Sequence, residues 1–388
     1  MELDKLIKLI DNGHKKVIVF GNGKIGKRVI NILIPRIKRL DNLLICDNDR
    51  NKQGVKYKGI EIMPIESAAK ENRDAVYIIA TTRYVNEMKK QLLENEISEK
   101  NIYVDLPDSL LHASEIRKWS EKTKKKKILN FEVNINKHCN LKCCGCDHFA
   151  PLADEDFYDI NEYKSDIERL SYIFDGAAGT ILLLGGEPLL NPQINQYASI
   201  ARKNFPEAKI AIITNGILLE SMEEKFWKNC CACDISIAIT KYPIKINYDK
   251  IEKIGQEFGV KIEYMELGDQ ESRLLWKYPL DINGNQDAIR SFTYCENANT
   301  CITLEHGYLY TCSIMPNAYI FNNFFHTKLK ITDVDGVDIY DDLTPDDIFS
   351  ALARPVSFCR YCDVMHRSYG HKWRISEKKI SEWTDTNT

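Results

Sequence analysis

The sequence contains no run of about eighteen apolar residues, the length that a membrane-crossing helix needs. It has no excess of one charge either, because 53 Lys and Arg residues stand against 56 Asp and Glu residues, for a net charge of −3. This balance argues against a general polyanion binder, so no nucleic-acid partner is expected. The first residues, MELDKLIKLIDNGHKK, have the spacing of an amphipathic helix and lack the apolar core of a signal peptide. Together these absences predict a cytoplasmic protein without a membrane span.

Cysteine, by contrast, is abundant, with 13 among 388 residues. One is at position 46, four lie at 139–146, three at 230–233, three at 295–312, and two at 359 and 362. Cytosolic thiols are kept reduced, so this clustering favours metal ligands over disulfides or scattered core thiols. Cys46 and the three at 230–233 adjoin apolar strand-like stretches, where we expect them to be buried small hydrophobic residues.

Strands and helices alternate along the first part of the chain. Short apolar strands are expected at residues 15–21, 42–49, 75–82 and 101–105. Segments with helical spacing separate them, which predicts a parallel sheet in a doubly wound unit. The first strand runs into GNGKIG, which places Gly21, Gly23 and Gly26 at the start of a helix, and Asp47 ends the next strand. In a dinucleotide-binding motif of this kind the glycine loop faces a phosphate and the acidic residue faces a ribose hydroxyl.

The alternation resumes after a charged stretch, RKWSEKTKKKK at residues 117–127, which is typical of a solvated linker. The further strands are expected at residues 128–135, 179–185, 209–214, 233–240 and 259–265. This series predicts a partial (β/α)6 TIM-type barrel with reactive groups at the C-terminal ends of its strands. The expected α/β organisation is a Rossmann-like domain at 1–115, a linker at 116–127, a partial barrel at 128–270, a small cysteine-rich subdomain at 271–375 and a tail at 376–388. The last residues of the tail, SEWTDTNT, are expected to be frayed.

The densest cysteine cluster, HCNLKCCGCDHFAPLA, begins where the first barrel strand ends. Cys139, Cys143 and Cys146 have the spacing C-x3-C-x2-C, whereas a structural zinc site normally takes four ligands in paired C-x2-C units. Adjacent cysteines rarely both reach one ion, so Cys144 is interpreted as a non-ligand. A loop of three cysteines suits a [4Fe–4S] cluster that leaves one iron open to another ligand.

In this loop the sequence resembles the radical S-adenosylmethionine (radical SAM) enzymes. Three further stretches carry the resemblance: LLLGGEP, IITNG and SIAITKYP, which end the next three expected strands. The resemblance implies that the three cysteines hold the cluster and that its open iron binds the amino and carboxylate groups of S-adenosylmethionine. It also implies contacts with that cofactor from Gly185, Gly186, Glu187, Pro188, Asn215 and Ser236, with Thr240 as a weaker candidate. Glycines allow close backbone approach, and a carboxylate accepts strong hydrogen bonds from an ammonium group.

One position departs from the family pattern. The family usually has an aromatic residue just before the third cysteine, near the adenine, whereas this chain has Gly145. Phe149 and His148 are the alternatives for that contact. His148 is equally well interpreted as a histidine on the substrate side or as a surface residue.

The C-terminal cysteines predict a second metal site. Cys295, Cys312, Cys359 and Cys362 resemble the ligands of the auxiliary [4Fe–4S] cluster in the twitch subdomain, a shortened relative of the SPASM domain. Cys301 competes with Cys295 as the first ligand, and a four-cysteine zinc site is the alternative. A cluster held by four cysteines suits electron transfer with the substrate radical.

The resemblance implies that reductive cleavage of S-adenosylmethionine yields a 5′-deoxyadenosyl radical, which abstracts a hydrogen atom from the substrate. An external reductant such as flavodoxin or ferredoxin is then needed. The N-terminal domain resembles those attached to bacterial sugar-modifying and cell-surface glycan enzymes, where it holds a nucleotide or nucleotide-sugar. A sugar or nucleotide-linked sugar is therefore the expected substrate, with dehydrogenation or epimerisation as the reaction. The alternatives are a peptide-modifying enzyme and an iron–sulfur redox sensor or electron carrier.

Overall fold

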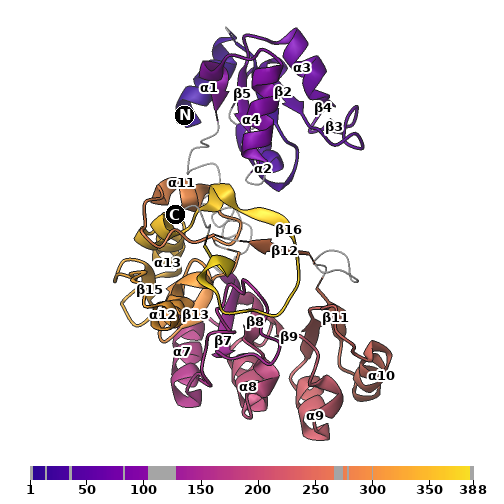
Figure 1. Cartoon of the computed structure of the whole chain (residues 1–388), viewed down its shortest axis with the longest axis vertical. Coiled ribbons are helices and arrows are strands. Elements are labelled where there is room, and N and C mark those ends of the chain that lie inside the picture. Colours follow the sequence, from indigo (N-terminus) through magenta and orange to yellow (C-terminus); the bar gives the residue numbers. More distant parts are fainter. Residues whose placement is uncertain are drawn as a thin grey trace. The chain divides into compact units, whose positions relative to one another are not determined.

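The computed structural model describes residues 3–13, 15–34, 37–81, 84–103, 128–265, 274–277, 279–298 and 300–384 (Figure 1). The chain divides into two compact units. The first contains Met1–Lys118 with Ile289–Cys295, and the second contains Trp119–Ala288 with Glu296–Thr388. The linker expected at 116–127 lies outside the described residues, and the other domain boundaries stay predictions.

The first unit is built around a six-stranded sheet with the order β3-β4-β2-β1-β5-β6. Its strands are β1 (Val17–Phe20), β2 (Leu43–Cys46), β3 (Lys56–Tyr57), β4 (Ile60–Met63), β5 (Val76–Ile79) and β6 (Ile102–Tyr103). Neighbouring strands are parallel, except for β3 and β4, which pair antiparallel. β1 and β5 are buried along their whole length, as in strands covered by helices on both faces. The predicted doubly wound α/β unit is confirmed.

Helices supply the apolar cover of this sheet. They are α1 (Leu3–Asn12), α2 (Lys24–Leu33), α3 (Ile65–Glu71) and α4 (Val85–Glu94), with short 3-10 turns η2 (Leu40–Asn42) and η3 (Glu99–Asn101). Val29, Ile30 and Leu33 repeat at helical spacing along α2 and are fully buried in the core of the unit. The unit also includes α11 (Ala288–Tyr294) from Ile289 onward.

The second unit contains an eight-stranded sheet with the order β11-β10-β9-β8-β7-β13-β14-β15. Its strands are β7 (Ile128–Asn136), β8 (Ala178–Gly185), β9 (Lys209–Thr214), β10 (Ile235–Ile239), β11 (Ile262–Tyr264), β13 (Thr303–Glu305), β14 (Tyr308–Tyr310) and β15 (Gly336–Asp338). β7 to β11 are parallel and follow one another in chain order, as predicted. The sixth parallel strand, β13, pairs with β7 at the opposite edge and continues into the antiparallel β14 and β15.

Four helices connect the five consecutive parallel strands and lie along the same side of the sheet (Figure 1). They are α7 (Ile160–Ile173), α8 (Ile194–Asn204), α9 (Glu224–Ala232) and α10 (Tyr248–Phe258). α7 begins at Asp159, whose carboxylate accepts hydrogen bonds from the backbone N–H groups of Asn161 and Glu162. Because each crossover places its helix on this side, the other face of the sheet remains for the site.

The second unit contains further elements besides this sheet and its connecting helices. They are η4 (Pro188–Leu190), η5 (Leu219–Ser221), β12 (Leu274–Lys277), α12 (Ile314–Phe325), α13 (Pro345–Leu352), η6 (Ser357–Tyr361), η7 (Val364–His366), β16 (Ser368–Lys372) and η8 (Ile380–Glu382). β12 and β16 form a separate antiparallel pair. We call the apolar group around α12 and η6 the C-terminal core; it contains Met315, Phe321, Phe358 and Trp383.

Two expectations are wrong in part. The end of the tail, SEWTDTNT, is not frayed as far as Thr384, because Trp383 is only 3% exposed and packs in the C-terminal core. Cys46 and Cys230 are buried as predicted, but Cys231 is exposed, because it faces away from the sheet on α9. Among the described helices, none has both the length and the apolar composition to cross a membrane.

Candidate metal centre

The cysteine loop follows β7 directly. Cys139, Cys143 and Cys146 are partly exposed, and none of them forms a disulfide. Burial raises the pKa of the Cys139 thiol to about 11 and that of Cys143 to about 12, and the charge of Cys146 raises both. The Cys139 and Cys143 thiols therefore stay protonated without a cation and would form thiolates when a metal binds. The loop therefore fits a multi-iron centre with three thiolate ligands.

Cys144 belongs to different surroundings. Its backbone N–H donates to the carbonyl of Arg374 at 2.9 Å. Burial, followed by the charge of Glu382, raises the pKa of its thiol, while Arg374 lowers it. These contacts support its interpretation as a non-ligand. Cys146, Asp147 and His148 offer ligand atoms that all lie within 4.8 Å of one another, a second arrangement that suits a cation.

The two glycines of GGEP bring the end of β8 against the residues that precede Cys139. The N–H of Gly186 donates to the carbonyl of Asn136 at 2.8 Å, and the N–H of Glu187 donates to that of His138 at 3.0 Å. A Cβ atom on Gly185 would lie 2.0 Å from the Asn136 oxygen, and one on Gly186 2.0 Å from the His138 oxygen. Only glycine permits this approach, so the motif anchors the start of the cysteine loop.

Glu187 joins the second motif to the third. Its carboxylate is 1% exposed and accepts hydrogen bonds from Leu189 N at 3.1 Å, Thr214 Oγ1 at 2.6 Å and Asn215 N at 2.9 Å. Burial raises its pKa to about 7, although these donors lower it. A carboxylate has about four acceptor positions, so one remains for a ligand.

Asn215 completes the connection to the cysteine loop. Its Nδ2 atom donates to Asn140 Oδ1 at 2.7 Å and lies 3.8 Å from Cys139 Sγ.

Pro188 begins the 3-10 turn η4. Ser236 is 7% exposed on β10 and donates to the carbonyl of Ile210, and Thr240 pairs with the end of β9 through its N–H. The residues predicted after β7, β8 and β9, together with Thr240 after β10, thus lie along one edge of the sheet, whereas Ser236 is the second residue of β10 and pairs with Ala211 near the start of β9.

A C-terminal segment, residues 373–384, covers the cysteine loop and was not predicted. Trp373 Nε1 donates to Cys143 Sγ at 3.1 Å, and Trp383 Nε1 donates to the Cys146 carbonyl at 2.8 Å. Cys143 also forms an antiparallel bridge with Ile375. The two tryptophans are the one feature of this stretch of sequence that could have indicated a contact with the loop. Neither of them is part of a periodic apolar pattern.

This segment accounts for Gly145. The residue has φ +65°, and a Cβ atom there would lie 3.2 Å from the carbonyl oxygen of Glu382. A side chain would be strained and would press on the covering segment. Phe149 is 1% exposed and packs against Phe321 and Trp383 in the C-terminal core, so its ring faces apolar side chains.

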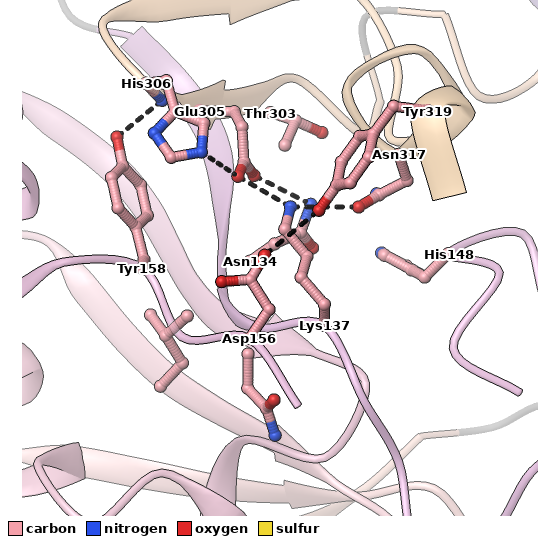
Figure 2. A network of polar contacts seen from close by, with 12 residues as sticks. Asn134, Lys137, His148, Asp156, Tyr158, Thr303, Glu305, His306, Asn317 and Tyr319 are labelled. Atoms are coloured by element: carbon pink, nitrogen blue, oxygen red, sulfur yellow. Dashed lines mark hydrogen bonds and ion pairs between the residues drawn. The ribbon is translucent and has the colours of Figure 1, made fainter. Parts of the chain in front are cut away.

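A buried polar network lies beside the cysteine loop (Figure 2). Lys137 Nζ contacts Glu305 Oε1 at 2.6 Å and Asn317 Oδ1 at 3.1 Å, and the Lys137 and Glu305 side chains are each 4% exposed. Asn134 Nδ2 donates to Glu305 Oε2 at 3.3 Å, while its Oδ1 atom is buried without a partner. We call these residues, with Glu132, Thr303 and His148, the interior network.

Glu132 and His148 extend the interior network toward the cysteines. Thr303 is the register partner of Glu132 and donates to its carboxylate at 3.0 Å. Burial raises the pKa of Glu132 to about 7. His148 Nε2 lies 4.0 Å from Glu132 Oε1 and has no hydrogen-bond partner. Buried polar atoms without partners, so close to the loop, mark a place where a ligand group would be stabilised.

Three C-terminal cysteines contact the C-terminal core. Cys312 follows β14, Cys359 is in η6 and Cys362 follows it, and all three pack against the C-terminal core. Cys295 follows α11 in the first compact unit, and Cys301 lies in the second unit. An auxiliary cluster on these residues, and the choice of its fourth ligand, stay predictions.

The first unit has a pocket of about 380 Å³ at the C-terminal ends of β1, β2 and β5. Gly21, Gly23 and Asp47 line it. The Asp47 carboxylate accepts from Asn22 N at 2.5 Å and Asp49 N at 2.8 Å, so it first stabilises the loop. Gly26 does not line the pocket; a Cβ atom there would lie 1.7 Å from the Gly21 oxygen, so it permits close packing of α2.

Comparisons with known proteins agree with this geometry. The family model described as Radical SAM superfamily matches residues 133–241, and the one described as C2185-like, N-terminal, matches residues 13–103. The first match covers β7 to β10 with the cysteine loop and GGEP. Radical SAM domains use S-adenosylmethionine and a [4Fe–4S] cluster, which the three thiols at the end of β7 fit.

Curated relatives match parts of the chain. A GTP 3′,8-cyclase of Helicobacter pylori is 26% identical over 129 residues, which are 33% of this chain and 39% of that protein. The probable GTP 3′,8-cyclase of Methanocaldococcus jannaschii is 23% identical over 272 residues, which are 63% of this chain and 83% of that protein. The match to the Helicobacter protein thus spans about two fifths of its length.

Solved structures give distant likenesses. The structure of BtrN in complex with AdoMet and 2-DOIA has a TM-score of 0.40 at 19% identity, covering 62% of this chain and 94% of that one. Native anSMEcpe with bound AdoMet has a TM-score of 0.36 at 13% identity, covering 61% of this chain and 84% of that one. Both scores are too low to support a functional statement.

Proposed function

We propose, since the radical SAM superfamily model matches residues 133–241, that this chain is a radical SAM enzyme that acts on a sugar-containing substrate. A bound [4Fe–4S] cluster would supply the electron that cleaves S-adenosylmethionine. The resulting 5′-deoxyadenosyl radical would abstract a hydrogen atom from the substrate. The observation that carries the proposal is the hydrogen-bonded connection from Glu187 through Asn215 to Asn140 and Cys139. It brings three strand-end motifs to one place.

The chain's own residues have distinct roles in this proposal. Cys139, Cys143 and Cys146 would hold the cluster, because all three are partly exposed in the loop that follows β7. Glu187 has an acceptor position left for the amino group of the cofactor. Gly185, Gly186, Pro188, Asn215 and Ser236 are the remaining proposed contacts with S-adenosylmethionine. An external one-electron reductant is required, and flavodoxin or ferredoxin is the proposed donor.

The interior network supports a hydroxylated substrate. Its acceptors are the carboxylates of Glu132 and Glu305 and the Oδ1 atom of Asn134, while the ammonium group of Lys137 is already paired with Glu305. Such acceptors can take hydrogen bonds from sugar hydroxyls. We propose dehydrogenation or epimerisation of a sugar or nucleotide-linked sugar. A nucleoside triphosphate, suggested by the names of the curated relatives, is the second candidate.

Two further sites belong to the proposal. The pocket at Gly21, Gly23 and Asp47 is a proposed site for the nucleotide part of a ligand. Cys312, Cys359 and Cys362, with Cys295 or Cys301, are the proposed ligands of an auxiliary [4Fe–4S] cluster that exchanges an electron with the substrate. Zinc is the alternative metal at these cysteines.

The first experiment measures cofactor cleavage. The protein is reconstituted anaerobically and reduced with dithionite, and 5′-deoxyadenosine and iron per chain are measured. We expect cleavage and about eight irons per chain if both clusters form. Cys143→Ala should abolish cleavage, whereas the matched variant Cys144→Ala should retain it. No cleavage under any reductant or substrate would contradict the proposal and favour an electron carrier.

The second experiment identifies the substrate class. UDP-glucose, GTP and a deuterated free sugar are each added, and 5′-deoxyadenosine is measured with its deuterium content. Stimulation by UDP-glucose or deuterium transfer from the sugar supports the proposal. Stimulation by GTP alone overturns the sugar assignment in favour of a cyclase-like reaction. If none of these compounds stimulates cleavage, the peptide-modifying alternative becomes the better description.

A further inference from the structure

A tryptophan from the covering segment donates a hydrogen bond to one of the cysteine sulfurs. Trp373 Nε1 lies 3.1 Å from Cys143 Sγ, well within the range for a bond to sulfur. The nearest donors to Cys139 Sγ are longer contacts, Leu141 N at 3.4 Å and Asn215 Nδ2 at 3.8 Å. Cys143 therefore receives the shortest of these bonds, and it comes from a residue 230 positions away.

The backbone around Trp373 holds the donor in place. Cys144 N donates to the Arg374 carbonyl at 2.9 Å, and Ser376 N donates to the Lys142 carbonyl at 2.9 Å. The Tyr242 ring lies 6.0 Å from the Trp373 ring. Since these contacts fix both the segment and the ring, the indole N–H needs no rearrangement to meet the sulfur.

Hydrogen bonds to cluster sulfurs change the energy of the two redox states unequally. The reduced cluster carries more negative charge on its sulfurs, so an N–H donor stabilises the reduced state more than the oxidised state. A donor at this distance thus raises the reduction potential, and its loss makes the cluster harder to reduce.

We propose that Trp373 is a positioning residue whose indole N–H raises the reduction potential of the cluster on Cys139, Cys143 and Cys146. This inference rests on the proposed function for the presence of the cluster. It assigns to the C-terminal segment a role in electron acceptance as well as in covering the loop.

The chain offers a matched pair of variants. Trp373→Phe removes the donor to sulfur and keeps an aromatic ring in the cover. Trp383→Phe removes a donor of the same kind from the same segment, but that donor binds the Cys146 carbonyl instead of a sulfur. Trp373→His restores an N–H donor on a smaller ring.

The test is an anaerobic redox titration of each reconstituted protein, followed by the electron paramagnetic resonance signal of the reduced cluster at matched iron content. For Trp373→Phe we expect a more negative potential, with the reduced-to-oxidised ratio at a fixed solution potential several-fold below wild type. A tenfold fall corresponds to about 59 mV for a one-electron couple. Trp383→Phe should keep the wild-type potential, and Trp373→His should shift back toward it. An unchanged potential in Trp373→Phe overturns the inference.

A measurement on the wild-type protein keeps the test decisive if Trp373→Phe does not retain iron. Protein labelled with nitrogen-15 in the tryptophan indole is reduced and examined by electron spin-echo envelope modulation. A nitrogen coupling that persists in Trp383→Phe supports the bond from Trp373, and its absence overturns it. A wild-type protein that shows this coupling but never cleaves S-adenosylmethionine would contradict the proposed function alone.

Discussion

The buried ion pair between Lys137 and Glu305 gives a stringent test of the interior network. The two side chains are each 4% exposed and lie 2.6 Å apart. Asn317 accepts a second hydrogen bond from Lys137, and Asn134 donates to Glu305. Replacing Lys137 by Met removes the ammonium group and keeps most of the aliphatic side chain, so the change isolates the charge.

The expected loss follows from what remains behind. In Lys137→Met the Glu305 carboxylate stays buried without its cation, a situation that costs about 3–5 kcal/mol. Replacing both members by apolar residues, as in Lys137→Met with Glu305→Leu, removes the uncompensated charge. The free energy of unfolding of the double variant should therefore recover most of the loss.

Urea unfolding followed by circular dichroism, at matched iron content, measures both variants. The control is Lys209→Met, which breaks the surface pair with Glu263; these side chains are 53% and 23% exposed, and the expected loss is below about 1 kcal/mol. If Lys137→Met costs no more than Lys209→Met, or if the double variant is as unstable as Lys137→Met, the reasoning about the buried pair is refuted.

Two other predictions concern GGEP. The pKa of Glu187 is raised by burial from 4.5 to about 7, so in the metal-free protein its contribution to stability is complete below pH 4.5 and is lost as the pH rises through 7. When the free energy of unfolding is measured from pH 4 to 8, that of Glu187→Gln should rise by up to about 3 kcal/mol relative to that of the wild type. If the two proteins have parallel pH profiles, Glu187 is not a buried carboxyl that titrates in this range. Gly186→Ala should lower the free energy of unfolding by about 1–3 kcal/mol and release iron, because its Cβ atom would meet the His138 oxygen. Gly23→Ala, with no atom within 4 Å of the new Cβ, serves as its control, and equal losses from the two changes would contradict the close approach.

Local patterns were sufficient for much of the fold. Buried strands such as β1 and β5 are continuous apolar runs, and helices such as α2 repeat apolar residues at helical spacing, so short windows of sequence reveal both. The predicted site at the strand ends follows from the same periodicity, because consecutive parallel strands present their C-terminal ends at one edge. The cysteine loop, GGEP and Asn215 fall at such strand ends, and their roles were expected from the resemblance to radical SAM enzymes.

Contacts between distant segments were not predicted. β13 pairs with β7 although about 170 residues separate Thr303 from Glu132, and the Lys137–Glu305 pair depends on that pairing. Trp373 reaches Cys143 in the same way. Such contacts leave no periodic signal, since each residue is consistent with many partners until the chain has folded.

The sequence by itself indicated the cysteine loop as a metal centre, the glycines of GGEP as places of close approach and the expected class of chemistry, because each depends on residue types at fixed short spacing. Only the tertiary structure decided that Glu187 connects two motifs, that Gly145 makes room for the backbone at Glu382, and that a tryptophan from the C-terminal segment donates to a cysteine sulfur. These features depend on which surfaces come within a few ångströms of one another, and that is set by the packing of the whole unit.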